Sequence, residues 1–489
     1  MQANTQRGEA TGTGGEARVE LKRELGLVAA ISVNVANIIG TGIFLKARVM
    51  TCNVGDAPSV LFVWVAAGLL VLAGALAYAE IASMHPEAGG DYVFLRKAYG
   101  RFTGFLYGWT FFTVARCGSQ AALAVGFAIF LNVAFGGALD AVSYRVELLG
   151  ASWQLSLLTI VALSAIWIIT VMNCISLTAG GNAAVILTIL KLMMLVGVAA
   201  VALLFGQGDW SHLGMSAAGG TCEDVSAGAM GGMAGFGAAM LGALWAYDGW
   251  NNSTAMSGEI RDPARNVPRT FFIGTSCVIA LYLVVNVGFF YVLSPAQIAS
   301  VSPSSSVGTE VLQTFMGPGA VTLMAVALAA STFGALHASV MANARIPFAM
   351  ARDGLFFRRL GQVSRRSHVP VNALLVQGAW ASVLALSGTF DTLTDSVMFA
   401  SWLFYGLTTA TLFVFRRTMP DAARPYRVWG YPAVPLLFLA VTTLVLISAL
   451  VATPRQALNG LVMMALGVPF YLYWSRRSGH RERLSAAET

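Results

Sequence analysis

Three ionisable residues of this sequence lie inside long apolar segments, where a charge is costly. Lys191 lies well inside one apolar run and Arg116 near the middle of another, while Asp248 interrupts a third. A charged side chain at the centre of a membrane helix costs roughly 2.5–3.5 kcal/mol on insertion scales, so each needs a partner or a polar cavity. The chemistry open to these residues is therefore electrostatic recognition of a small charged group.

Other chemistries have no matching pattern in the sequence. No nucleophile elbow, phosphate-binding loop or cluster of His, Asp and Glu converges on any segment, so we expect neither enzymatic activity nor a cofactor. The cysteines are scattered, without a Cys-x-x-Cys pair or histidines at ligand spacing, which argues against a metal site. They are Cys52, Cys117, Cys174, Cys222 and Cys277. Cys52 and Cys222 can both face the outside and form a disulfide, but we expect unpaired thiols.

Two glycines interrupt the first apolar segment, at Ile38-Ile39-Gly40-Thr41-Gly42-Ile43. A helix that breaks here leaves backbone N–H and C=O groups at membrane depth, where only protein, water or a ligand can satisfy them. Broken helices of this kind hold small charged substrates in many secondary transporters. The same pattern also lets another helix pack closely, and the hexapeptide alone leaves both interpretations open.

A second interruption lies five apolar segments later, at Trp245-Ala246-Tyr247-Asp248-Gly249-Trp250-Asn251-Asn252. An acid, a glycine and two amides stand where a membrane helix is normally apolar, although the amides alone could simply cap the next helix. Because five is odd, the second half of the chain must insert upside down relative to the first. Paired broken helices in inverted halves predict a substrate site between the two breaks.

The elements that must position these residues are membrane spans. The 489 residues are 57% hydrophobic and only 11% charged, whereas soluble domains are about 25% charged. Apolar segments of roughly 20 residues recur along the chain and predict an all-α polytopic membrane protein. We predict twelve spans, at residues 25–49, 59–84, 102–135, 154–174, 182–205, 229–257, 270–293, 318–350, 370–390, 395–415, 432–452 and 457–474.

The basic residues predict the orientation of these spans. Most of the 30 lysines and arginines fall in connections on one side of the membrane, the side that also holds the N-terminus. Positive loops face the cytoplasm, so we expect a multi-pass protein of the plasma (inner) membrane with both termini inside. The net charge of +7 follows from this distribution and implies no nucleic-acid partner. The outer loops hold Lys46, Arg48, Arg145 and Arg455.

The spans divide the chain into units. We expect cytosolic tails at residues 1–24 and 475–489, a first five-helix repeat at 25–205 and an inverted second repeat at 229–415. Two further helices occupy residues 432–474.

Five separate segments resemble the amino acid–polyamine–organocation transporter superfamily, and most of all its L-type amino acid transporter branch with the bacterial relatives. They occur in the expected order at Ile39 to Phe44, Pro86 to Tyr92, Trp245 to Trp250 with the following Glu259 to Pro263, Arg345 to Gly354, and Arg424 to Pro432. The resemblance implies a LeuT-type fold with two inverted five-helix repeats and two further helices. It also implies movement of an α-amino acid by alternating access, usually as exchange.

The resemblance assigns the substrate site to the two breaks. Thr41 and Gly42 would hold the carboxylate with N–H and hydroxyl groups, since a half-helix N-terminus attracts an anion. The ammonium would be held by backbone carbonyls of Asn37 or Ile38, Trp245, Ala246 and Asp248. Trp245 would also close over bound substrate from outside, and ordinary packing is its alternative role.

Lys191 and Arg116 each carry two interpretations. Sodium-independent relatives have a lysine at the position of Lys191, whose ammonium would bond the loosened carbonyls of the first span; alternatively it extends to the cytoplasmic side. The cystine/glutamate exchanger has an arginine at the position of Arg116, which suggests an acidic substrate. If Asp248 pairs with Arg116 instead, the site is neutral. His337, the histidine of the eighth span, is expected to be a bonded core residue.

The leading prediction is a sodium-independent exchanger of mainly neutral L-amino acids. A proton-coupled permease for amino acids or polyamines, or an exchanger that accepts acidic amino acids through Arg116, are the alternatives. Mammalian L-type subunits are linked to a glycoprotein through a cysteine between the third and fourth spans. The corresponding loop here, at about 136–153, has no cysteine, so we expect a monomer without a covalent heavy chain.

Overall fold

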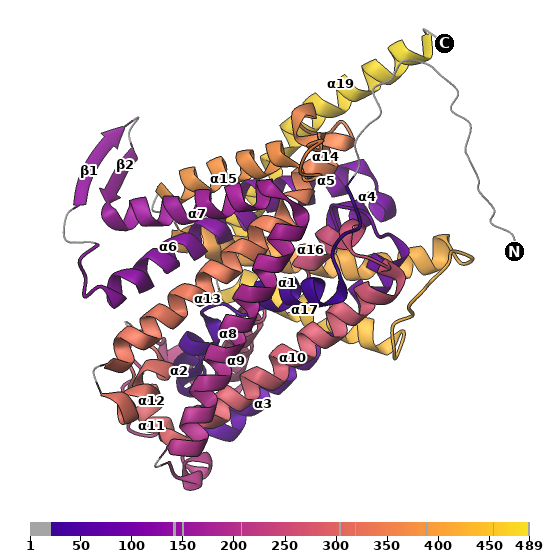
Figure 1. Ribbon diagram of the computed structural model, residues 1–489. Helices are drawn as coiled ribbons and strands as arrows, with labels where there is room; N and C mark the ends of the chain where they lie inside the picture. Colours follow the sequence, from indigo (N-terminus) through magenta and orange to yellow (C-terminus); the bar gives the residue numbers. More distant parts are fainter. Residues whose placement is uncertain are drawn as a thin grey trace, which may run out of the picture.

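Helices make up most of the computed structural model (Figure 1), which describes residues 21–139, 143–148, 151–206, 208–302, 305–317, 319–386, 390–452 and 454–487. The predicted N-terminal tail lies almost wholly outside these residues. The α-helices are α1 (Leu27–Ile38), α2 (Gly42–Val54), α3 (Ala57–Met84), α4 (Asp91–Tyr99), α5 (Arg101–Thr110), α6 (Cys117–Ala134), α7 (Leu157–Ile175), α8 (Leu177–Phe205), α9 (Gly232–Ala246), α10 (Pro263–Val292), α11 (Pro295–Ala299), α12 (Val307–Met316), α13 (Gly319–Asn343), α14 (Arg345–Arg352), α15 (Val371–Leu386), α16 (Phe390–Thr418), α17 (Ala433–Ala452), α18 (Pro454–Ala465) and α19 (Gly467–Ala487).

Tighter and wider helical turns complete the inventory of helices. The π-helical segment η1 (Phe111–Arg116) joins α5 to α6 without a break in the helix. The 3₁₀ segments are η2 (Trp210–Gly214), η3 (Ala227–Ala229), η4 (Asn252–Glu259) and η5 (Arg358–Gly361).

The helices are those of a polytopic membrane protein. Within the described ranges, eight helices are long and apolar enough to span a membrane, and the bent pair of α1 and α2 brings the number to nine. The shorter helices α9 and α15 are also apolar. Each of the twelve segments predicted from hydropathy contains helix, so the predicted helical class is confirmed.

A β-hairpin between α6 and α7 departs from the entirely helical prediction. Strands β1 (Ser143–Leu148) and β2 (Ala151–Ser156) pair antiparallel, with Ser143 opposite Ser156. The hairpin projects from the helices beside α6 and α7 in Figure 1. Tyr, Val and Leu alternate with Arg and Glu along β1, and this period of two is the strand signal that hydropathy averaging conceals.

Two groups of short helices lie at opposite ends of the molecule (Figure 1). At one end, α2 packs against α11 and α12, and at the other α4 packs against α5 and α14. At the first end a disulfide joins Cys52 of α2 to Cys222, whose Cα atoms lie 5.7 Å apart. The expectation of unpaired thiols at these two positions is therefore wrong. Partners 170 residues apart meet through the tertiary fold, which their spacing does not reveal.

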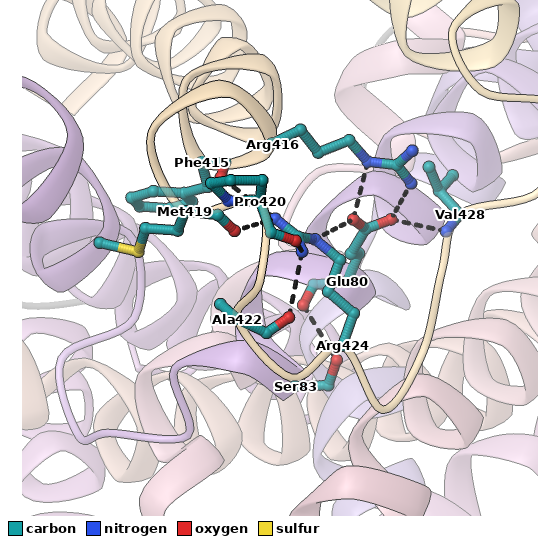
Figure 2. Close-up of polar contacts among 9 residues, drawn as sticks. All are labelled: Glu80, Ser83, Phe415, Arg416, Met419, Pro420, Ala422, Arg424 and Val428. Atoms are coloured by element: carbon teal, nitrogen blue, oxygen red, sulfur yellow. Dashed lines mark hydrogen bonds and ion pairs between the residues drawn. The ribbon is translucent and has the colours of Figure 1, made fainter.

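Buried carboxylates hold the other end together. Figure 2 shows Glu80 of α3, which is fully buried, between two arginines of the region around the end of α16. Arg416 donates two hydrogen bonds to its carboxylate, at 2.9 and 2.7 Å, and the Val428 N–H donates a third at 2.7 Å. Arg424 Nε lies 3.6 Å away. This cluster fixes the loop before α17 onto α3.

The other segments of the resemblance are joined at the same end. Arg345 of α14 forms a buried two-bond pair with Glu259 of η4, at 2.6 and 2.7 Å. The Tyr92 hydroxyl of α4 donates to Asp353 at 2.6 Å, and Arg96 pairs with the same carboxylate. Helix α14, with the residue that follows it, therefore connects α4 to the chain that follows the second break.

Candidate functional site

The first predicted break is confirmed. Helix α1 ends at Ile38 and α2 begins at Gly42, with the two axes bent by 42°. An α-helix leaves its last carbonyls and its first N–H groups without intrahelical partners. The break therefore presents carbonyl oxygens from the end of α1 and N–H groups of Gly42 and Ile43 from the start of α2.

The second predicted break is confirmed as well. Helix α9 ends at Ala246, the chain turns at Gly249 with a φ of +93°, and the 3₁₀ segment η4 begins at Asn252. A side chain at this φ would be strained, which is the reason for a glycine at this point in the turn.

The two breaks touch each other. A Cβ on Gly42 would lie 2.7 Å from the Cβ of Ala246, and one on Gly249 would lie 2.4 Å from the Asn37 carbonyl oxygen. The Asn252 amide donates to the Asn37 side chain at 3.0 Å. The residues predicted to hold an amino acid thus come from two distant stretches and meet at one place, and only glycine permits this approach.

A tyrosine of α10 bonds carbonyls on both sides of the predicted ammonium site. The Tyr282 hydroxyl, which is fully buried, lies 3.1 Å from the carbonyl oxygen of Ala246 and 3.4 Å from that of Ile38. The Trp245 carbonyl accepts from the Asp248 N–H at 3.1 Å. One hydroxyl proton cannot satisfy two carbonyls fully, so the junction retains acceptor capacity for a further donor.

Lys191 contacts the first break. Its ammonium donates to the carbonyl oxygens of Ala36 at 3.1 Å and Ile39 at 2.5 Å, and the side chain is 1% exposed. One turn earlier on α8, the Thr188 hydroxyl donates to the Ser32 carbonyl at 3.0 Å. The geometry agrees with the contact expected for Lys191 and not with an extended side chain that reaches water.

Arg116 and Asp248 lie together at the second break. Arg116 Nη1 is 3.7 Å from an Asp248 carboxylate oxygen, and the Arg116 side chain is buried. Tyr405 of α16 bridges the pair, because its hydroxyl donates to Asp248 at 2.7 Å and accepts from Arg116 at 3.2 Å. Arg116 Nε has no partner among the described residues, so one donor is left for a ligand.

The amides after Asp248 make tertiary contacts. Asn251 accepts a hydrogen bond from Arg116 Nη2 at 3.3 Å and donates one to Asp91 at 2.9 Å. Asn252 bonds Asn37, as described above. Neither side chain caps the helix that follows, because η4 begins without a side-chain capping bond. The capping interpretation of these amides is therefore wrong.

Trp245 lines a cavity of about 170 Å³ next to the junction of the breaks. The cavity is lined by α2 residues, by Trp245 and by the chain around the start of α12. The Lys46 ammonium lies 4.7 Å from the centre of the Trp245 ring. Trp245 therefore belongs both to the second break and to the lining of this cavity.

The described residues contain no group of three or more His, Cys, Asp and Glu side chains that could hold a metal ion. What the site offers instead is a helix N-terminus for an anion, carbonyl ends for a cation, and a paired arginine and aspartate beside them.

Comparison with known proteins decides the family. A model of amino acid permeases matches residues 25–472, which is nearly the whole chain. The chain belongs to the amino acid permease family. It is a transporter of amino acids and not an enzyme.

The relatives of this permease include an exchanger and two transporters. The serine/threonine exchanger SteT of Bacillus subtilis is 30% identical over 461 residues, which cover 94% of this chain and 98% of SteT. The large neutral amino acids transporter small subunit 2 of Mus musculus is 30% identical over 96% of this chain and 85% of its own. The human b(0,+)-type amino acid transporter 1 is 29% identical over 94% and 90%.

Two tyrosines of the permease site were missed from the sequence. Tyr282 and Tyr405 lie within apolar segments, where a tyrosine is unremarkable as a packing residue, and nothing in the pattern marks their hydroxyls. His337 agrees with its expected role: Asn173 Nδ2 lies 3.1 Å from its Nδ1 and the Gly180 carbonyl oxygen 2.9 Å from its Nε2. It is a bonded core histidine.

Proposed function

We propose that this permease is a sodium-independent exchanger of mainly neutral L-amino acids, working by alternating access. The amino acid lies at the junction of the two breaks. Its carboxylate accepts from the N-terminal end of α2, at Thr41 and Gly42, and its ammonium donates to carbonyls at the ends of α1 and α9. The ammonium ligands are the backbone oxygens of Asn37 or Ile38, Trp245, Ala246 and Asp248.

The contact of the two breaks supports this placement. Opposite helix ends attract opposite charges, so a zwitterion is matched by an arrangement in which a helix start and two helix ends meet. Tyr282 already holds two of the carbonyls, and the incoming ammonium, with three donors, can share or replace that hydroxyl. Trp245, at the outer side, closes the site from outside.

Sodium independence rests on Lys191, and this is the observation that carries the proposal. Its ammonium donates to the Ala36 and Ile39 carbonyls, so a resident positive charge satisfies the loosened end of α1. A cation supplied by the protein removes the need for one from solution.

Replacing sodium by choline in a proteoliposome assay is therefore expected to leave uptake unchanged. We expect Lys191→Met to abolish most transport, because the Ala36 and Ile39 carbonyls lose their donor at membrane depth. The matched control is Thr188→Val, which removes the neighbouring bond from α8 to α1 and is expected to retain transport. Wild-type uptake that collapses in choline contradicts the proposal.

The choice of neutral substrates rests on Arg116. Its pairing with Asp248 and Tyr405 leaves no net charge from that pair, which favours side chains without charge. The free Nε donor of Arg116 favours the second candidate, an exchanger that also accepts acidic amino acids. A panel of neutral, acidic and cationic amino acids in the same exchange assay separates the two.

Exchange itself is supported by the relatives, since SteT is named a serine/threonine exchanger.

We further propose a LeuT-type fold of twelve spans, with inverted repeats at 25–205 and 229–415 and two further helices at 432–474. The protein lies in the plasma (inner) membrane, with both termini in the cytoplasm. The permease works as a monomer without a covalent heavy chain.

A further inference from the structure

Asp91 is a buried acid that the substrate site described above does not use. It is the first residue of α4 and is 1% exposed. Three neutral donors hold its carboxylate: the Asn251 amide at 2.9 Å, the Thr254 hydroxyl at 2.9 Å and the Tyr78 hydroxyl at 3.2 Å. In the described part of the chain, no basic side chain lies within ion-pair distance of it.

One of these donors connects Asp91 to Arg116. An ionised carboxylate only accepts hydrogen bonds, so Asn251 must turn its NH₂ group toward Asp91. Its oxygen then faces Arg116 Nη2, at 3.3 Å, and a guanidinium only donates. The chemistry at both ends of the amide requires the same orientation. Asp91 and Arg116 therefore reinforce one orientation of the Asn251 amide, which joins the two charged groups.

We propose that Asp91 is a positioning residue for substrate-charge selection, which acts through Asn251 to hold Arg116 beside Asp248 and adds a second negative charge that disfavours acidic amino acids. The inference rests on the proposed function and names the excluded substrate class. Without Asp91, the buried cluster has one guanidinium against one carboxylate. With it, the cluster has one guanidinium against two.

The charge of Asp91 can be removed by mild acid. Burial raises the pKa of Asp91 to about 6, although its hydrogen bonds with Thr254, Asn251 and Tyr78 and the charge of Arg116 lower it. Asp91 is thus ionised at pH 7.5 and mostly protonated at pH 5.5. The protonated acid carries an O–H donor, so it no longer requires the NH₂ group of Asn251 and no longer opposes an anionic substrate.

His85 lies close to α4, with its Nδ1 atom 3.2 Å from the Lys97 ammonium. Burial and the nearby Lys97 lower the pKa of His85 to about 4, so this histidine stays neutral at both pH values. Other titratable and charged groups face Asp91 or α4 from the elements packed around them. They include Tyr78 of α3, Tyr107 and Arg101 of α5, Arg116 of η1, Tyr405 of α16, Asp353 after α14 and Glu87 before α4.

The test is the substrate preference of Asp91→Asn in reconstituted proteoliposomes. We measure the KM of L-glutamate and of L-leucine in exchange at pH 7.5. A unit charge about 12 Å from a bound charge, at an effective dielectric constant of about 20, changes an equilibrium constant about tenfold. We expect the KM of glutamate, relative to that of leucine, to fall by about this factor in the variant.

The matched control is Asp353→Asn. Asp353 is a second carboxylate that binds α4, through Tyr92 and Arg96, but it has no link to Arg116. Its loss is expected to lower transport of both substrates alike and to leave their KM ratio unchanged. An Asp91→Asn variant that behaves in the same way overturns the inference and assigns Asp91 a purely structural role.

A second measurement needs no variant. Lowering the pH from 7.5 to 5.5 on both sides of the membrane is expected to move the wild-type KM ratio toward glutamate, because Asp91 becomes protonated while glutamate remains ionised. A ratio that does not move overturns the inference even if Asp91→Asn fails to fold.

These outcomes separate the inference from the function on which it rests. A wild type that exchanges leucine but excludes glutamate, with no shift on either treatment, contradicts only the role of Asp91. A wild type that exchanges glutamate as readily as leucine contradicts both the neutral-substrate proposal and the inference. A wild type that exchanges no amino acid also contradicts both the proposed function and the inference.

Discussion

At the scale of single residues, the site is governed by charges that have partners inside the protein. Lys191 donates to backbone carbonyls, and Arg116 lies against Asp248 and Tyr405. Removing one partner of a buried pair leaves the other charge uncompensated, which costs roughly 3–5 kcal/mol. Substrates that supply the missing charge recover part of this cost.

Charge substitutions at the pair are therefore expected to redirect substrate preference. Asp248→Asn leaves Arg116 unpaired and should lower the KM of acidic relative to neutral amino acids by about tenfold. Arg116→Gln leaves Asp248 without its basic partner and should lower the KM of cationic relative to neutral amino acids. The measurement is competitive exchange against radiolabelled leucine.

The double variant Arg116→Gln with Asp248→Asn is the control, because it restores the net charge of the wild-type cluster and should recover the neutral preference. If both single variants weaken all three substrate classes equally, the pair only stabilises the fold and does not select the substrate.

Residues could be predicted from the sequence where a charge stood in an apolar run. Lys191, Arg116 and Asp248 were found in this way, and the structure brings Lys191 to the first break and the other two together at the second. Tyr282 and Tyr405 could not be found, because a tyrosine in a span has many ordinary packing roles. The orientation of Asn251 could not be predicted either, since it depends on Asp91 and Arg116, which lie 160 and 135 positions away in the sequence.

At the scale of elements, the two broken helices depend on close approach at glycines. Their existence followed from glycines and polar residues inside apolar segments, but their mutual contact required the fold. Asn37 and Gly249 lie far apart in the chain, and the tertiary fold brings them together. The disulfide between Cys52 and Cys222 was missed for the same reason, because its partners meet only in the fold. The hairpin of β1 and β2 was missed because hydropathy averaging hides a period of two.

Substitution of Gly249 tests the contact of the breaks. Gly249→Ala places a methyl group 2.4 Å from the Asn37 carbonyl oxygen at a φ of +93°, and a strained residue of this kind costs about 1–3 kcal/mol before the clash is counted. We expect transport to fall by at least about tenfold, with a lower melting temperature in detergent.

Gly197→Ala is the matched control for this substitution. A Cβ on Gly197 of α8 meets no atom within 4 Å, so the variant should retain transport and melt no earlier than the wild type. Normal transport in Gly249→Ala contradicts the close contact of the breaks.

At the scale of the whole molecule, the permease joins a helical membrane scaffold to a site made from both halves of the chain. One end is joined by a disulfide and the other by buried carboxylates, Glu80 with Arg416 and Glu259 with Arg345. The junction of the breaks lies between these ends. The alternating access that we propose requires this junction to open toward one side at a time.

The most direct test of the central claim is counter-exchange in proteoliposomes of the purified permease. Uptake of radiolabelled L-leucine or L-threonine is measured into vesicles that are empty or preloaded with unlabelled neutral amino acid, in sodium or choline buffer. We expect preloading to accelerate uptake by about tenfold or more, equally in both buffers and without an imposed pH gradient. Equal uptake into empty vesicles, or uptake driven by a sodium or proton gradient, would contradict an amino acid exchanger in which Lys191 replaces the coupling cation.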